Sequence, residues 1–172
     1  MLNSNQILEE NLIKLDNAKG KPAQVGYDLS IKQVNKVGNQ VPNGKIGMVL
    51  KDQTLLNTHT PVEKIILEGK RGFLLYEGVY DIVMNEGCKI ASNRVGLVRQ
   101  RSSLMRNGAI ITSSIFDPGF KTSSVGTYMI VFETIFIEEN ARVAQMYFHE
   151  CEPVAKDKLY NGQWQNDKQR NK

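Results

Sequence analysis

The sequence predicts an all-β fold, a distorted β-barrel or jelly roll, with a short helix at its N-terminus. After Gly20-Lys21-Pro22 the chain becomes a series of short apolar runs, and turn residues such as Asn107-Gly108 and Asp117-Pro118-Gly119 separate them. Many short strands at this spacing are typical of barrels and jelly rolls, and they argue against a fold of alternating strands and long helices. The predicted strands are Val25–Ile31, Lys45–Leu50, Val62–Leu67, Gly72–Tyr76, Val79–Met84, Val95–Val98, Ala109–Ile115, Thr127–Phe132 and Ala141–Phe148.

Two short helices are expected beside these strands. Ser4 is a suitable N-cap for the first, and Leu8, Leu12 and Leu15 follow at the i, i+4 and i+7 positions of one helical face. The second is a single turn and a half, Ser102–Arg106, between two predicted strands.

Size and composition indicate one domain covering residues 1–172, because 172 residues of which 41% are apolar can build one ordinary core. No apolar run approaches the ~20 residues that a membrane span needs. Residues 1–6 lack the basic region and apolar stretch of a secretory signal. Cys88 and Cys151 form no Cys-x-x-Cys pair, so reduced structural thiols are expected. Together these features predict a cytoplasmic protein with no membrane partner.

The basic residues fall in two places. Residues 156–172 contain five basic and two acidic side chains, a net charge of +3, and either a solvated end or a segment that closes over a ligand would explain them. Residues 94–106 contain Arg94, Arg99, Arg101 and Arg106 without an acid. These arginines lie within an apolar pattern and so belong to folded structure. That favours a defined pocket for a small polyanion and makes nucleic-acid binding a poor explanation.

The segment Arg101-Ser102-Ser103-Leu104-Met105-Arg106 is the strongest candidate for that pocket. Guanidinium groups match phosphate oxygens, and hydroxyls donate hydrogen bonds at short range. The alternative is an ordinary helix with surface arginines. Asp117-Pro118-Gly119-Phe120 is a tight turn in any case, and its carboxylate and ring could hold a sugar or simply satisfy the turn. His149-Glu150-Cys151 lacks the cysteine pair of a zinc deaminase, so a zinc site is not expected.

The order of these segments resembles the dCTP deaminase branch of the dUTPase superfamily. The matching segments are Gly26–Leu29, Arg101–Arg106, Asp117–Phe120, Ala141–Met146 and Tyr160–Gln165, after an opening helix within residues 1–15. The resemblance implies a dUTPase-like barrel that assembles as a homotrimer, with sites between subunits. It also implies dCTP or dUTP as the ligand, with Mg²⁺ carried by the triphosphate.

The resemblance assigns roles to individual residues. Ser102 and Arg106 would meet the phosphates or the reacting centre, and Asp117 the 3′-hydroxyl of the deoxyribose. Phe120 would pack under the sugar. The remaining substrate-binding residues would be Arg101, Ser103, Gln145, Tyr160, Gln163, Trp164 and Gln165.

Two departures from the family pattern bear on the activity. A catalytic Glu is expected ten residues after Asp117, where this chain has Thr127. If residues 121–125 form a longer loop instead, the acid is expected near Val131, and Glu133 two residues on is the nearest candidate base. The second departure is Gln163 where the family has Lys, with Trp164 in place of Tyr, which removes a charge from the triphosphate contacts.

Three functions are therefore open at this stage. The first is a dCTP deaminase, with or without further hydrolysis to dUMP, in which Glu133 activates water while Arg106 and Ser102 stabilise the intermediate. The second is a dUTP diphosphatase without deaminase activity, in which Asp117 orients water and no Glu is needed. The third is a nucleotide-binding homologue that has lost its base.

Overall fold

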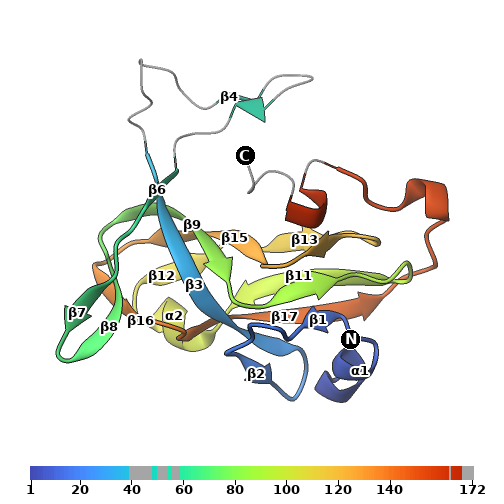
Figure 1. Cartoon of the computed structure of the whole chain (residues 1–172), viewed down its shortest axis with the longest axis horizontal. Coiled ribbons are helices and arrows are strands. Elements are labelled where there is room, and N and C mark those ends of the chain that lie inside the picture. The colour runs from blue at the N-terminus through green and yellow to red at the C-terminus, as the bar shows by residue number, and fades with distance from the viewer. Residues whose placement is uncertain (39–47, 50–53, 56–58, 163, 168–172) are drawn as a thin grey trace.

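The protein is built around one strongly curled antiparallel sheet, the half-barrel in the centre of Figure 1. The computed structural model describes residues 1–38, 48–49, 54–55, 59–162 and 164–167. The predicted all-β barrel class is confirmed. Among the described residues, no helix combines the length and apolar character that crossing a membrane requires.

The helices are α1 (Ser4–Glu9) and α2 (Ser102–Arg106), with 3-10 helices η2 (Lys156–Lys158) and η3 (Gln165–Asp167) near the C-terminus. The strands are β1 (Ile13–Lys14), β2 (Lys21–Pro22), β3 (Tyr27–Val37), β4 (Met48–Val49), β5 (Thr54–Leu55), β6 (His59–Pro61), β7 (Ile65–Leu67), β8 (Lys70–Leu75), β9 (Gly78–Met84), β10 (Gly87–Lys89), β11 (Arg94–Gln100), β12 (Ala109–Ile111), β13 (Ser114–Phe116), β14 (Lys121–Thr122), β15 (Gly126–Val131), β16 (Ile135–Glu138) and β17 (Arg142–Glu150).

The main sheet runs in the order β12-β15-β9-β3-β17-β11-β13, with β2 and β6 also pairing with β3. The long strand β3 bends through the middle of it, with β9 on one side and β17 on the other. Two smaller three-stranded sheets have the orders β1-β10-β14 and β16-β8-β7. Burial alternates along β15, as expected for a strand with one face on the core. Thr127, Met129 and Val131 are buried, whereas Tyr128 is half-buried.

The N-terminal helix is shorter than predicted, and its cap is Asn3 rather than Ser4. The side chain of Asn3 accepts from the Gln6 backbone N–H, and the Gln6 side chain accepts from the Asn3 N–H, so the two form a capping box. Asn11 has a φ of 51°, which ends the helical path. Leu12 is therefore buried beyond the helix, and Leu15 is exposed.

Most predicted strands are present, with shifted bounds. The run Ala109–Ile115 is divided into β12 and β13, because the chain leaves β15 and crosses to β11 at Thr112 and Ser113. The run Val62–Leu67 is a strand from Ile65 on, since the Val62 N–H instead bonds Val34 O in the ladder of β6 with β3. The predicted strand Lys45–Leu50 lies mostly outside the described residues. The sequence pattern does not predict strands β1, β2, β5, β6, β10, β14 and β16.

A fully buried carboxylate, Glu86, holds the loop before β2 against β3. Its oxygens accept hydrogen bonds from the backbone N–H groups of Lys19, Gly20 and Ser30 and from the Ser30 hydroxyl, at 2.7 to 2.9 Å. Asn85 donates to the same hydroxyl. Its burial and these hydrogen bonds make Glu86 part of the core.

Candidate active site

The short helix α2 presents the predicted phosphate-binding groups to solvent. Leu104, 6% exposed, anchors it in the core, and the Arg101 N–H donates to Val143 O at its start. Ser102, Ser103 and Arg106 are all exposed. Within the described residues no ion pair involves Arg106. This helix therefore offers two hydroxyls and a guanidinium on its outer side.

Arg101 is held by a buried carboxylate that the sequence did not identify as part of the site. Asp28 on β3 has a side chain only 7% exposed, and its Oδ2 lies 2.9 Å from Arg142 Nη1 and 3.4 Å from Arg101 Nε. Arg101 Nη1 also donates to Arg142 O at 3.3 Å. Two guanidinium groups share one carboxylate, so the cluster keeps a net positive charge beside α2.

The second half of the predicted site is the turn after β13. The Phe120 N–H donates to Asp117 O at 3.0 Å, and Gly119 takes a φ of 90°, which favours glycine. The Asp117 side chain is exposed. Phe120 packs edge-on against Phe116, with ring centroids 5.3 Å apart. The turn thus presents a carboxylate next to a partly covered aromatic ring.

Within one chain, α2 and this turn lie at opposite ends of β11. Phe116 pairs with Gly96, which places Asp117 opposite Val95. Arg101 follows six residues after Val95, so the two groups are about 20 Å apart along the strand. Figure 1 shows the same separation, with α2 beside β12 and β16 and the segment after β17 at the other end. A single chain therefore does not bring the two halves of the site together.

The C-terminal segment folds onto the aspartyl turn of its own chain. The Tyr160 N–H donates to Pro118 O, and the Tyr160 ring packs edge-on against Phe120. Gln165 donates to Gly119 O. Trp164 is partly exposed, and Gln163 lies outside the described residues. Most of the aromatic and amide groups predicted for substrate binding are thus gathered around one turn.

Gln145 lies elsewhere. Its Nε2 donates to Val25 O at 2.7 Å, and it pairs with Arg99 on β11 and Asp28 on β3. Gly26, the residue after Val25, has a φ of 80°. Its backbone lies so close to β17 that a Cβ added there would lie 2.6 Å from Met146 O. In this structure the Gln145 amide fastens the start of β3 to β17.

The two candidate positions for a catalytic carboxylate differ in their surroundings. Thr127 is buried on β15, where its hydroxyl donates to Thr112 O at 3.0 Å and lies 2.9 Å from Ser114 Oγ. Glu133 lies in the bend after β15, because that strand ends at Val131, so it does not continue the strand's alternation. Its exposed side chain packs over Gly108, two residues after Arg106 in the sequence.

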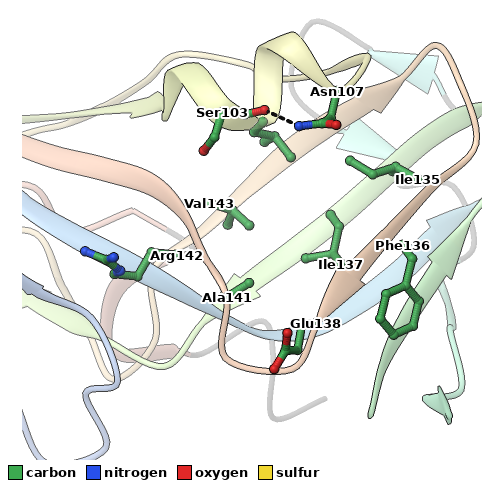
Figure 2. A pocket seen from close by; sticks show the side chains of 10 residues that line it. Ser103, Asn107, Ile135, Phe136, Ile137, Glu138, Ala141, Arg142 and Val143 are labelled. Carbon is green, nitrogen blue, oxygen red and sulfur yellow. Dashed lines mark hydrogen bonds between the residues drawn. The ribbon is translucent and has the colours of Figure 1, made fainter. Parts of the chain in front are cut away.

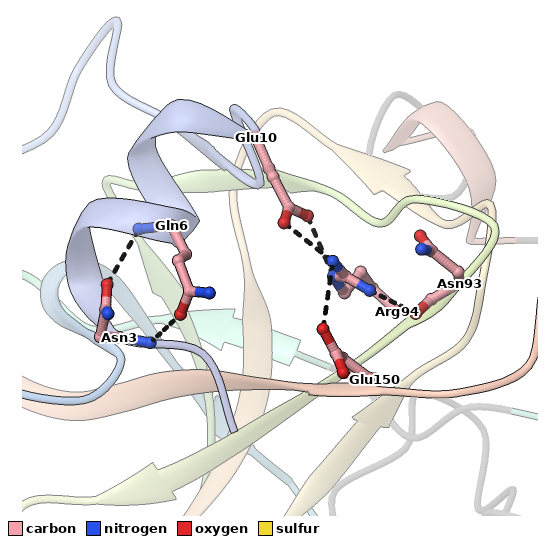
Figure 3. Close-up of polar contacts among 6 residues, drawn as sticks. All are labelled: Asn3, Gln6, Glu10, Asn93, Arg94 and Glu150. Carbon is pink, nitrogen blue, oxygen red and sulfur yellow. Dashed lines mark hydrogen bonds and ion pairs between the residues drawn. The ribbon is translucent and has the colours of Figure 1, made fainter.

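The arginines of residues 94–106 are not equally available to a ligand. Arg94 is 11% exposed and forms a two-pronged pair with Glu10, at 2.8 and 3.0 Å, with Glu150 at 3.6 Å on its other side (Figure 3). The hydrogen bond to Glu10 raises the pKa of Arg94 above its ordinary value. Arg94 therefore ties α1 to β11 and is not free to bind an anion in the pocket expected from residues 94–106.

A shallow pocket of about 240 Å³ lies between α2 and β16. Figure 2 shows Ser103 and Asn107 on one wall, Ile135 and Ile137 facing them, and Arg142 at one end. Pockets that bind small molecules usually measure about 300–1,000 Å³. This hollow is smaller than that, and its lining includes Ser103 but not Ser102 or Arg106.

Comparison with known proteins identifies the class. The model of the dCTP deaminase-like family matches residues 3–151, and the chain belongs to this family, within the dCTP deaminase/dUTPase superfamily. It is an enzyme of nucleotide metabolism.

Two curated relatives and one crystal structure are similar to this chain over most of its length. A probable deoxyuridine 5′-triphosphate nucleotidohydrolase of Methanosarcina mazei is 27% identical over 97% of both chains. The deoxyuridine 5′-triphosphate nucleotidohydrolase of Methanocaldococcus jannaschii is 33% identical over 76% of this chain and 80% of its own. The 2′-deoxycytidine 5′-triphosphate deaminase of Agrobacterium tumefaciens shares the fold, with a TM-score of 0.60 and 18% identity over 91% of this chain and 50% of its own.

Proposed function

We propose that this protein hydrolyses dUTP to dUMP and pyrophosphate. The observation that carries the proposal is that β15 (Gly126–Val131) contains no carboxylate. Thr127 lies ten residues after Asp117, and its hydroxyl forms hydrogen bonds inside the protein. A deaminase of this family needs a base there to activate water. Hydrolysis of the triphosphate needs a carboxylate that orients water, and the exposed Asp117 provides one. The names of the two curated relatives support the same activity.

The active unit under this proposal is a homotrimer with sites between subunits. The separation of about 20 Å between the two halves of the site supports it, because a second copy must supply the other half. Arg106 with Ser102 and Ser103 of one subunit would then bind the phosphates. Asp117 and Phe120 of the next would hold the deoxyribose and the attacking water.

Magnesium enters the proposal bound to the triphosphate. Within the described residues no group of three or more His, Cys, Asp or Glu side chains could hold a metal ion. In this proposal the phosphate oxygens of the nucleotide would hold the ion. Such an ion would neutralise charge that develops on the phosphates. Arg101, oriented by Asp28, would add a fixed positive charge beside them.

dCTP deamination is the second candidate, and the position of Glu133 favours it. Glu133 lies over Gly108 and close in sequence to Arg106, so a carboxylate is present on the α2 side of the site although it is not on β15. In this alternative Glu133 takes a proton from water and Arg106 stabilises the intermediate.

A paired product assay separates these candidates. The purified protein is incubated with dUTP and with dCTP, and pyrophosphate and ammonia are measured separately. Hydrolysis predicts pyrophosphate from dUTP without ammonia from dCTP. Ammonia from dCTP that disappears in Glu133→Gln would replace the proposal with deamination. Binding without either product would mean that the fold is kept for nucleotide binding alone.

A further inference from the structure

The pairing of β17 with β3 contains a bulge of one residue at Val143. Arg142 pairs with Ser30, and the register then shifts before Ala144, so that Val143 is an extra residue on β17. The carbonyl of Val143 accepts the N–H of Arg101 at 2.9 Å, at the start of α2. The bulge therefore provides a backbone acceptor that fixes where this helix begins.

The bulge also decides on which face of the sheet Arg142 lies. Asp28 and Ser30 lie two residues apart on β3, so their side chains share a face, and Arg142 shares it because it pairs with Ser30. Without the extra residue, Arg142 would pair with Ile31, whose side chain lies on the opposite face of β3. The bulge thus lets Arg142 Nη1 lie 2.9 Å from Asp28 Oδ2, and lets Arg142 O accept from Arg101 Nη1 at 3.3 Å.

A polar network of four residues, three of them buried, holds the strands at this bulge. Glu86 Oε2 accepts from the Ser30 N–H, and Glu86 Oε1 accepts from the Ser30 hydroxyl, both at 2.8 Å. The side-chain amide of Asn85 donates to the same hydroxyl and to Asn140 Oδ1, both at 3.0 Å. Asn140, with a φ of 61°, lies in the turn between β16 and β17. These four residues, the bulge network, connect β3 and the end of β9 to the start of β17.

We infer that the bulge network positions α2, and that Asn140 is the positioning residue that joins the network to β17. The network holds the bulge, and the bulge holds Arg101 in two ways. Its backbone is bonded to Val143 O, and its side chain is held by Arg142 O and Asp28. The phosphate-binding side chains of α2 follow directly after Arg101, so their positions depend on the same contacts. Their part in catalysis rests on the proposed function.

Two variants of Asn140 separate its side chain from its backbone. Asn140→Gly keeps the positive φ without strain and removes the oxygen that accepts from Asn85. Asn140→Asp keeps an oxygen acceptor and tolerates the same φ. Asn11→Gly is the matched control, because Asn11 is exposed, has a φ of 51° and donates locally to Glu9 O at 3.4 Å. Thermal unfolding curves identify a temperature at which all three variants are folded, and the measurements are made there.

Hydrogen exchange at the Arg101 amide, followed by NMR without nucleotide, reports how firmly the start of α2 is held. Asn140→Gly is expected to speed this exchange on the order of 10-fold or more, because the bulge loses its link to the network. The Thr112 amide, which donates to Tyr128 O on β15, is expected to keep its wild-type rate. Asn140→Asp and Asn11→Gly are expected to keep both rates. A wild-type rate at Arg101 in Asn140→Gly, or an equal rise at Thr112, would overturn the inference.

Steady-state hydrolysis of dUTP tests the part in catalysis. Asn140→Gly is expected to lower kcat/KM on the order of 10-fold or more, since small displacements of positioning groups are costly, and Asn140→Asp is expected to restore it. Faster exchange at Arg101 with a wild-type kcat/KM would confine the network to folding and refute the positioning role. The exchange experiment needs no turnover, so the hold on α2 can be confirmed even if the product assay overturns dUTP hydrolysis, and the reverse also holds.

Discussion

Replacing Asp28 by Asn tests how far the buried carboxylate organises this site. In the native protein its Oδ2 faces Arg142 at 2.9 Å and Arg101 at 3.4 Å, and its side chain is 7% exposed. Removing one partner from a fully buried pair costs about 3–5 kcal/mol. Both arginines are about one third exposed, and water will partly replace the lost contact. We therefore expect the free energy of unfolding to fall by about 1–3 kcal/mol.

Urea unfolding followed by circular dichroism measures this change. Asp16→Asn is the matched control, because Asp16 is exposed and its replacement is expected to change the free energy by less than about 0.5 kcal/mol. A double-mutant cycle of Asp28→Asn with Arg142→Gln isolates the coupling between the two groups. If Asp28→Asn is as stable as its control, the carboxylate does not hold the arginines, and the orientation of Arg101 needs another cause.

Further predictions concern a salt bridge, the phosphate site and pH. Arg94→Ala is expected to lower the free energy of unfolding by about 1–2 kcal/mol through loss of the pair with Glu10, and Arg99→Ala, an exposed arginine on the same strand, by much less. Arg106→Ala is expected to abolish turnover of dUTP in a stopped-time product assay without a loss of stability, and an unaffected rate would remove α2 from the site. Burial raises the pKa of Tyr128 above its ordinary value of 10.0, so folding favours the neutral form of this group. Its contribution to the free energy of unfolding is therefore complete below pH 10 and is lost as the pH rises further. Tyr128→Phe should flatten that fall in unfolding experiments between pH 9 and 11, and an unchanged slope would contradict the assignment.

The local sequence pattern predicts secondary structure correctly where the conformation of a segment depends mainly on its own residues. The helix Ser102–Arg106 and the turn at Asp117–Phe120 lie where they were predicted. Leucines at helical spacing predict a longer N-terminal helix than the structure has, because Asn11, with its positive φ, ends the helical path. The apolar run Ala109–Ile115 predicts one strand, because the pattern does not reveal that the chain crosses from β15 to β11 within it.

The sequence by itself determined the class of fold and the candidate groups, because strand length, turn residues and the types of reactive side chain are local properties. Only the tertiary structure decided which of those groups are available. Arg94 is neutralised by Glu10 from another element, Arg101 is oriented by Asp28 from β3, and Gln165 is engaged by the turn at Gly119. Each of these contacts joins residues far apart in the chain. Their partners therefore depend on how distant elements pack together, which a local pattern of side-chain types does not encode.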